Sequence, residues 1–469
     1  MPLDRLVPEL SVLLAAVAVV LAASLLPRRL QWLCASLAAL GLAVAAAAAA
    51  LQLSWPAQLT FDGAWAIDGV TVWAKLVILS ATLLVLSMSP EWLHRDPRHG
   101  EYYGVLLFAA AGALMMAGAA DTMELVIGVL LSSTTGYTLA AYHRGDDLSV
   151  EAGMKYFLVG ALANALLLIG VVWLFGLAGS TDYAAIADAV RSRQPGAPWL
   201  IAATFVVAGL CFKLGAVPAH TWMPDVAQGA PAPAAAFLTV VPKAGAAVAL
   251  VRLGQIVGGE LAAWSGLIAT LAVLSMTLGN LAALRQTDVR RLLGWSSVSQ
   301  SGYLLVAVAL VGHSTRALPA MIVFLAGYAA ANLAAFAVVT WLRGRTDIQD
   351  YRGLARARPW GMLVLTLAFL SLIGIPPLVG FAGKLLLMLA AVDGGRTWLA
   401  VAVVLNSVIS LFYYARVIGP MDFESPPSRV AVLGPWASAA MLVAGGLTLG
   451  LGLAVDALLR GLAGVTLLP

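Results

Sequence analysis

Charged residues are what this sequence has least of. Only 11% of its 469 residues are charged, while 61% are hydrophobic and the mean hydropathy is +0.93. Charged residues make up about a quarter of a typical soluble domain. The polar connections between the apolar runs are also too short to form a domain with its own core. The scarcity of charge therefore excludes a soluble globular fold and indicates a membrane protein.

Cysteine is also scarce, with only Cys34 and Cys211 in the chain. They lie in separate apolar runs and match neither a disulfide framework nor the spacing of a metal or iron–sulfur site. The sequence accordingly predicts no metal in this chain. A cleaved signal is not expected either, because the start, MPLDRLVPELSVLLAA, carries an acidic residue and continues into a full-length span.

What is present is a succession of long apolar runs. A membrane helix needs about 20 mostly apolar residues, and these runs predict an all-α polytopic membrane protein with about fourteen transmembrane helices. The polar stretches 182–193 and 347–359 are expected to be short surface helices or loops. The spans are expected at 9–26, 30–52, 67–89, 103–119, 122–142, 152–177, 197–216, 231–257, 261–285, 289–311, 315–342, 359–391, 397–419 and 431–459.

Arginine is unevenly distributed over the two sides of these spans, with fifteen on one side and seven on the other. Because cytoplasmic loops carry the excess of basic residues, the first side is predicted to be cytoplasmic and both termini periplasmic. The basic pI of about 9.1 then reflects topology, and no nucleic-acid signal accompanies it. The first side holds Arg28, Arg29, Arg95, Arg98, Arg144, Arg285, Arg290, Arg291, Arg343, Arg345, Arg352, Arg356, Arg358, Arg416 and Arg429. The other side holds Arg5, Arg191, Arg193, Arg252, Arg316, Arg396 and Arg460.

Lysine, unlike arginine, is confined to the apolar segments. The five lysines, against 22 arginines, are Lys75, Lys155, Lys213, Lys243 and Lys384. A cation at mid-membrane costs roughly 2.5–3.5 kcal/mol even on the gentlest scale, so it faces a cavity or a partner and marks a pathway by default. Burial can bring the pKa of a lysine amine, but not that of an arginine, into the working range. The lysines therefore predict proton handling.

Two of the lysines also have an ordinary structural explanation. Lys75 lies one or two turns into its span and is expected to snorkel toward the surface. Lys155 has Glu151 one turn before it, which is a favourable i, i+4 pair. A structural ion pair and a relay role both remain open for Lys155.

The other three lysines, Lys213, Lys243 and Lys384, lie too deep to snorkel, and we predict a proton-pathway role for each. His220 is either a packed core histidine or a relay group. Its position just beyond a proline favours the relay.

Prolines accompany the three deep lysines, at Pro218, Pro242, Pro376 and Pro377. Proline removes a helical hydrogen bond, and non-helical backbone at membrane depth is tolerated only where it is buried in protein or lines a wet cavity. We therefore predict helix breaks at these four positions.

The seventh and twelfth spans each carry a lysine beside a proline break, five spans apart. An odd number of spans per repeat inverts the second copy, and broken helices of this kind point to binding sites in repeat-built transporters. We predict two inverted five-helix repeats. Residues 1–102 hold helices 1–3, 103–257 the first antiporter-like repeat with helices 4–8, 258–419 the second, inverted repeat with helices 9–13, and 420–469 the C-terminal helix.

Five stretches of the chain carry a specific family resemblance. They are FKLGAVPAHTWMPDVAQGAPAPAAAFLTVVPKAGAAVALVRL, EAGMKYFLVGALANALLLIG, RRLLGWSSVSQSGYLLVAVAL, DYRGLARARP and LSLIGIPPLVGFAGKLLLMLAAV. In these the sequence resembles the antiporter-like subunits of proton-pumping NADH–quinone oxidoreductase, respiratory complex I, from about residue 60 to 420. The QGAP and VVPKA elements favour the chain N type over chains L and M and over subunits of cation/proton antiporters.

The resemblance implies a proton channel in a bacterial inner membrane, as one subunit of a redox-driven translocase. NADH, FMN, iron–sulfur clusters and quinone would be held by partner subunits, so no redox chemistry is expected in this chain. The expected partners are membrane-arm subunits of the M, K, J, A and L types, with the lipid bilayer and protons. Matching the family motifs makes Lys213 the central lysine, Lys243 the connecting lysine, Lys384 the lysine near the exit and Lys155 the lysine of the sixth helix.

The sequence departs from the family at a functional position. The fifth helix of the family carries a glutamate as partner of the central lysine, and that position falls on Leu130. Glu124 is a poor substitute because it lies six residues earlier, about 9 Å along the axis and turned away from that face. Gln300 stands where many relatives have histidine and cannot titrate. Gln300, together with Glu151 and Asp225, is retained as a possible supporting group.

Two classes of function stay open on the sequence. The first is a proton-translocating subunit, with a relay rewired through lysines, His220, water and hydroxyls such as Ser132, Ser133 and Thr134. The second is a structural membrane-arm subunit that conducts weakly or not at all. A homologous subunit of a membrane-bound hydrogenase or a cation/proton antiporter is a lesser alternative.

Overall fold

The structure of this chain is a computed structural model that describes residues 3–96, 99–192, 196–258, 262–424 and 431–468. These residues form nineteen α-helices, three short 3-10 helices and one antiparallel hairpin. The α-helices are α1 (Val7–Leu25), α2 (Trp32–Gln52), α3 (Gly69–Leu93), α4 (His99–Gly118), α5 (Thr122–Ala140), α6 (Asp147–Ala178), α7 (Tyr183–Ser192), α8 (Ala197–Leu214), α9 (Trp222–Gly229), α10 (Ala232–Val257), α11 (Ala262–Ala283), α12 (Val289–Ala309), α13 (Ala317–Trp341), α14 (Leu354–Ala357), α15 (Pro359–Ile373), α16 (Val379–Asp393), α17 (Thr397–Phe423), α18 (Pro435–Leu453) and α19 (Val455–Gly461). The other elements are η1 (Leu3–Leu6), η2 (Arg28–Leu30), η3 (Ile348–Tyr351), β1 (Gln58–Thr60) and β2 (Trp65–Ile67).

Thirteen helices of the described part are long and apolar enough to cross a membrane. A further crossing is divided between α15 and α16, which occupy the stretch predicted as the twelfth span. The prediction of an all-α polytopic membrane protein is thereby confirmed, apart from the short β1–β2 hairpin, which the sequence pattern did not reveal. The polar stretches hold α7 in one case and η3 with α14 in the other, as expected.

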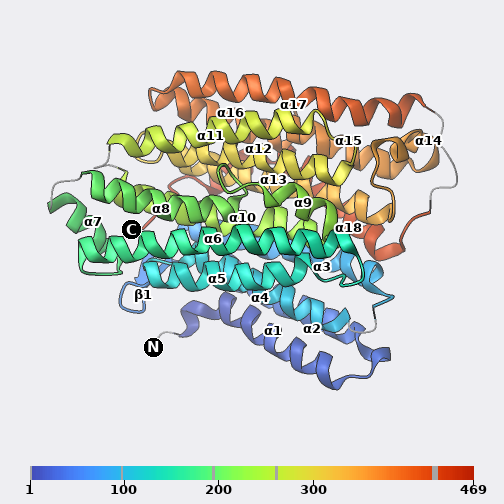
Figure 1. Cartoon of the computed structure of the whole chain (residues 1–469), viewed down its shortest axis with the longest axis horizontal. Helices are drawn as coiled ribbons and strands as arrows, with labels where there is room; N and C mark the ends of the chain where they lie inside the picture. The colour runs from blue at the N-terminus through green and yellow to red at the C-terminus, as the bar shows by residue number, and fades with distance from the viewer. Residues whose placement is uncertain (1–2, 97–98, 193–195, 259–261, 425–430, 469) are drawn as a thin grey trace.

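The helices run side by side, and the centre of the bundle is formed by α10, α12 and α13 (Figure 1). The most apolar window of α10 is fully buried, and those of α12 and α13 are 94% buried. The corresponding windows of α1 and α2 are only 33% and 28% buried. Lipid tails are as apolar as leucine, so outer helices of a membrane protein keep apolar side chains on their exposed faces. The buried helices at the centre are therefore the place to look for polar function.

Both ends of the described chain lie at the same end of the bundle (Figure 1). Asp68, before α3, accepts a hydrogen bond at 3.0 Å from the backbone N–H of Leu468. Gln52, at the end of α2, donates to the carbonyl of Arg5 at 2.9 Å. We call this the terminal end. The opposite end, where α3 and α5 finish and α6 begins, is the arginine-rich end.

Two of the crossings are interrupted inside the bundle. α8 ends at Leu214 and α15 ends at Ile373, and each is followed by a glycine with positive φ, +65° at Gly215 and +95° at Gly374. Only glycine adopts this left-handed conformation without a steric cost, and it commonly terminates helices. The chain then turns before α9 and α16 begin.

The prolines divide into two groups by their surroundings. Pro218 lies in the turn between α8 and α9, and Pro376 and Pro377 lie in the turn between α15 and α16. The break predicted at Pro242 is wrong, because α10 runs through this residue without interruption.

The continuity of α10 has a local explanation. Proline cannot donate to the carbonyl four residues earlier, here that of Leu238, and it crowds that turn. The next carbonyl along, that of Thr239, has a donor on a neighbouring helix. The carbonyl of Thr239 accepts a hydrogen bond at 2.7 Å from the hydroxyl of Tyr328 on α13. α10 continues through Pro242, and the Tyr328 hydroxyl ties this turn of the helix to α13.

Candidate proton-conducting axis

The three deep lysines lie inside the helix bundle. Lys213 on α8 and Lys243 on α10 have no exposed surface, and Lys384 on α16 is 3% exposed. All ion pairs between described residues lie elsewhere, so no described carboxylate neutralises these amines. A buried charge without a counter-ion is costly unless hydrogen bonds compensate it. The surroundings of the three amines must therefore supply neutral acceptors.

The ends of the two broken helices supply part of these acceptors. The last carbonyls of a helix have no intrahelical partner and carry the negative end of its dipole. Lys243 Nζ donates to the carbonyl of Leu214, the last residue of α8. Lys384 Nζ donates to the carbonyls of Leu372 and Ile373, the last residues of α15, both at 2.9 Å. Each interrupted helix thus ends on a buried lysine.

Lys243 also contacts a group of hydroxyls on α12 and α13. Its amine donates to Ser301 Oγ and, at 2.9 Å, to the carbonyl of Ser297. Ser297 Oγ lies 2.8 Å from the hydroxyl of Tyr328, which in turn donates to the carbonyl of Thr239. These hydroxyls can both donate and accept, so they can pass a proton without changing charge.

Lys384 has a comparable set of neighbours. Its amine donates to Ser407 Oγ at 3.2 Å and lies 4.3 Å from the centre of the Tyr303 ring. The Tyr303 hydroxyl is 3.3 Å from the same Ser407 Oγ. Gln300 Nε2 donates at 3.2 Å to the carbonyl of Leu372, which Lys384 shares. Gln300 therefore bonds to the group that holds Lys384 but does not itself titrate.

α12 connects the two lysine sites through adjacent residues. Ser301 contacts Lys243, and its neighbour Gln300 shares the Leu372 carbonyl with Lys384. On the other side, Lys213 directly precedes Leu214, whose carbonyl accepts from Lys243. Lys243 and Lys384 are thus linked through adjacent residues of α12, and Lys213 is the sequence neighbour of the residue whose carbonyl holds Lys243.

Lys213 has the fewest hydrogen-bond partners of the three lysines. Its amine donates to Ser132 Oγ on α5 at 3.3 Å and lies 5.4 Å from the ring of Phe212. Leu130, the position that the resemblance assigns to a glutamate, is 38% exposed on the outer surface of α5. Glu124 lies in the first turn of α5 and forms no ion pair with Lys213, both residues being in the described part of the chain. Ser132 is therefore the group on α5 that contacts Lys213.

Lys155 belongs to a separate charged cluster near the arginine-rich end. It pairs with Glu151 at 2.6 Å and with Asp225 at 3.4 Å, and its side chain is 43% exposed. Asp225 also pairs with Arg291 at 2.5 Å, and Arg291 donates to Gln228 at 3.1 Å. These residues line a cavity of about 260 Å³. The ion pair expected from the sequence is present, and Asp225 extends it to α12.

His220 lies in the turn between α8 and α9. Its ring is 5.8 Å from that of Trp295, and within the described part of the chain its Nδ1 is buried without a hydrogen-bond partner. The ring is therefore placed beside the broken helix, but the structure gives its Nδ1 no protein group with which to exchange a proton.

The expectation that Lys75 snorkels is wrong. Lys75 is fully buried, pairs with Glu9 of α1 at 2.7 Å and donates to Gln52 of α2 at 3.2 Å. Its carboxylate partner lies far away in sequence, so no local pattern revealed the pair. A second buried pair, Arg252–Asp68 at 3.1 Å, lies at the same end of the bundle. The first pair joins α3 to α1, and the second joins α10 to the residue before α3.

Several polar residues of the axis were not singled out from the sequence. They are Ser297, Ser301, Tyr303, Thr239, Tyr328 and Ser407. The signal was available in SSVSQSGY, where Ser297 and Ser301 are spaced four residues apart on a predicted helix. Such spacing places both hydroxyls on one face.

The two cysteines are unpaired, and the described potential metal ligands do not cluster. Cys34 and Cys211 are buried free thiols. Across the ranges that the structure describes, no three His, Cys, Asp or Glu side chains gather as a metal site.

The two interrupted helices and the buried lysines that their last carbonyls hold define an antiporter-like membrane subunit. Comparison with known proteins agrees with this class. The family model of the NADH:quinone oxidoreductase/Mrp antiporter transmembrane region matches residues 119–410. The chain belongs to this family.

Individual relatives place the chain near one branch of the family. It is 45% identical over 436 residues to NADH-quinone oxidoreductase subunit N of Mycobacterium sp. (strain JLS), covering 89% of this chain and 92% of that protein. It is 42% identical over 460 residues to subunit N 1 of Streptomyces griseus, covering 97% of each. A chain of the solved respiratory complex I from Thermus thermophilus is similar, with a TM-score of 0.84, 32% identity and coverage of 97% of this chain and 98% of that one.

Proposed function

We propose that this chain is the proton-translocating subunit N of a bacterial NADH-quinone oxidoreductase. The observation that carries the proposal is the pairing of each interrupted helix with a buried lysine, Leu214 with Lys243 and Leu372–Ile373 with Lys384. A lysine held only by neutral acceptors can lose its proton without leaving a buried unpaired carboxylate. A change in these acceptors is therefore enough to load or unload it.

In the proposed mechanism, protons move between the amines of Lys213, Lys243 and Lys384. Ser301 and Gln300 on α12 lie between the second and third amines, and Lys213 meets Ser132 at the start of the axis. A shift of α8 or α15 would move the carbonyls that hold the lysines and change the relative free energies of their charged states. One pKa unit corresponds to about 1.4 kcal/mol, so a small displacement suffices.

The wider setting follows from the relatives and belongs to the same proposal. The relatives are named as subunits N of NADH-quinone oxidoreductases, and we propose that NADH, FMN, iron–sulfur clusters and quinone are held by other subunits, so this chain would carry no redox chemistry. Its partners would be membrane-arm subunits of the M, K, J, A and L types. The location would be the bacterial inner membrane with both termini periplasmic, which makes the arginine-rich end cytoplasmic.

The repeat organisation is part of the proposal as well. Residues 103–257 and 258–419 would be inverted copies, each with one interrupted helix, α8/α9 in the first and α15/α16 in the second. Residues 1–102 and 420–469 would flank them.

Proton translocation is tested by Lys213→Met and Lys243→Met in the assembled complex, reconstituted in liposomes. We expect fewer protons translocated per electron in both variants, because methionine keeps the volume of the side chain but cannot be protonated. Arg460→Met, which removes an exposed cation outside the axis, is the matched control. A normal proton-to-electron ratio in both lysine variants, with normal assembly, would leave only a structural role.

A further inference from the structure

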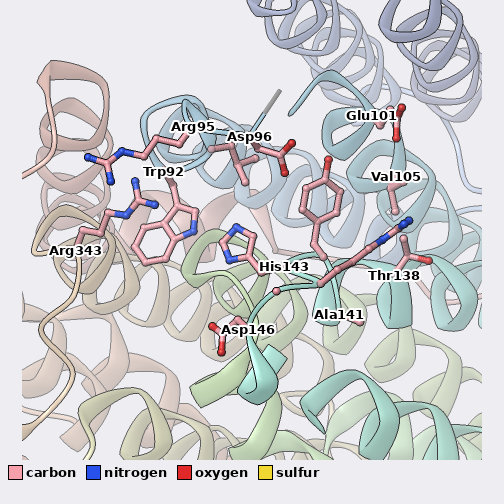
Figure 2. Close-up of a pocket in the computed structure, with 14 residues that line it drawn as sticks. Trp92, Arg95, Asp96, Glu101, Val105, Thr138, Ala141, His143, Asp146 and Arg343 are labelled. Atoms are coloured by element: carbon pink, nitrogen blue, oxygen red, sulfur yellow. The ribbon is translucent and has the colours of Figure 1, made fainter. Parts of the chain in front are cut away.

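A large cavity lies at the arginine-rich end, and no residue of the lysine axis lines it. It has a volume of about 770 Å³ and is formed where α3, α4, α5 and α13 end or begin. Its walls carry three arginines, three carboxylates and one histidine. Figure 2 shows Arg95 and Arg343 on one side with Trp92, and Glu101 with Thr138 on the opposite side.

The arginine side of the cavity has an unbalanced charge. Arg343 and Arg95 both line it, and among described residues neither guanidinium has a carboxylate within ion-pair distance. Arg343, which follows the end of α13, has the pKa of its guanidinium lowered, first by burial and then by the positive charge of Arg95. Two cations that repel each other at a cavity wall are stabilised by an anion between them.

Trp92 adds a neutral donor to the two cations. The Arg343 guanidinium lies 4.9 Å from the centre of the Trp92 ring, which fixes its plane. Trp92 Nε1 is buried and has no hydrogen-bond partner within the described ranges. In Figure 2 the indole lies between Arg343 and His143. A buried N–H without an acceptor is costly, and an anion oxygen in the cavity would satisfy it.

We propose that Arg95, Arg343 and Trp92 form a binding site for a phosphoryl group. Guanidinium groups bind phosphate oxygens in a bidentate manner, and the two forks with the indole N–H provide a set of donors without an acceptor of their own. The carboxylates of Asp96, Glu101 and Asp146 on the remaining walls repel a second anion and confine the phosphoryl group to the arginine side. An ammonium-bearing phosphate ester would complement both sides. The phosphoryl group can come from inorganic phosphate or from a phospholipid headgroup.

The binding test uses the assembled complex and radiolabelled inorganic phosphate in equilibrium dialysis. We expect Arg343→Gln and Arg95→Gln to lower the affinity at least about tenfold, since each removes charge-assisted hydrogen bonds. Trp92→Phe should lower it about fivefold, the effect of one neutral hydrogen bond. Arg356→Gln, which removes an exposed arginine from α14, is the matched control and should bind as the wild type does.

A second measurement separates the two sources of the phosphoryl group. Phospholipid retained by the purified complex is quantified for the wild type and for Arg343→Gln. Loss of one phospholipid in the variant, without phosphate binding by the wild type, assigns the site to a lipid headgroup. Phosphate binding without a difference in lipid assigns it to the soluble anion.

Equal phosphate affinity and equal lipid content in the wild type and in Arg343→Gln would overturn the proposal. If Arg343→Gln fails to assemble, Arg95→Gln decides in its place, because Arg95 is exposed and its replacement leaves the packing intact. Neither measurement depends on proton translocation, so the site can exist whether or not the lysine axis conducts.

Discussion

Lys213 and Ser132 are joined by a hydrogen bond of 3.3 Å between Nζ and Oγ, from α8 to α5. This contact lies two residues beyond Leu130, where the family resemblance places a glutamate. Leu130 is 38% exposed on the outer surface, whereas Ser132 is fully buried. The central lysine therefore has a neutral hydroxyl as its partner on α5.

Removing this hydroxyl should impair proton loading. A hydrogen bond to a charged group contributes about 1.5–3 kcal/mol, so Ser132→Ala should reduce the population of protonated Lys213 about tenfold or more. We expect a lower proton-to-electron ratio in reconstituted complex. Thr134→Ala, which removes an exposed hydroxyl from the same helix, is the control and should pump normally. Equal ratios in the two variants would show that Ser132 is not on the path.

The buried pair Glu9–Lys75 should contribute to stability in a way that replacing one partner and replacing both partners will distinguish. Glu9→Gln leaves the fully buried Lys75 ammonium without its counter-ion, and breaking a buried pair from one side costs about 3–5 kcal/mol. Replacing both residues, Glu9→Leu with Lys75→Met, should recover most of that loss because no buried charge remains. The measurement is thermal unfolding of the purified complex. A double variant no more stable than Glu9→Gln alone would contradict the assignment.

The sequence predicts those features that depend on local pattern and on the cost of charge in lipid. The depth of Lys213, Lys243 and Lys384 follows from the length of the apolar runs around them, and the Glu151–Lys155 pair follows from one helical turn of spacing. The inverted repeats stay a prediction.

What the sequence cannot supply is contact between distant segments. Lys75 was expected to snorkel because its partner Glu9 lies 66 positions away, on another helix. Pro242 was expected to break its helix because the Tyr328 hydroxyl that helps satisfy the backbone there comes from α13. The sequence indicates that hydroxyls of Ser132, Ser133 and Thr134 are available near Lys213, but it does not show which of them contacts the amine. The rotation of α5 against α8 decides this, and it selects Ser132.

Glu91 should anchor the C-terminal helix to α3. Its carboxylate accepts hydrogen bonds from the backbone N–H groups of Trp436 and Ala437, both at 3.0 Å, in the first turn of α18. A carboxylate at this position satisfies unpaired donors and complements the helix dipole. Glu91→Ala should destabilise the start of α18 by about 1–2 kcal/mol, seen as faster amide hydrogen exchange there. Glu424→Ala, which breaks an exposed pair with Arg352, should leave α18 unchanged.

His143 should make the stability of the arginine-rich end depend on pH. It lies in the loop between α5 and α6, where burial is the main cause that lowers its imidazole pKa. The charges of Arg343 and Arg290 lower the pKa further, while the carboxylates of Asp146 and Asp96 oppose them.

The sign of the effect follows from linkage. Near pH 6.5 the unfolded chain binds a proton that the folded chain does not. The stabilisation by neutral His143 is therefore complete above about pH 6.5 and is lost as the pH falls through the lower, folded-state pKa. We expect thermal unfolding between about pH 5 and 8 to show a loss of stability on acidification that is smaller in His143→Gln. His94→Gln replaces an exposed histidine at the same end and should keep the wild-type profile. Parallel profiles for the wild type and His143→Gln would mean that the imidazole is equally protonated in the folded and unfolded chain, and that burial in this cavity does not control it.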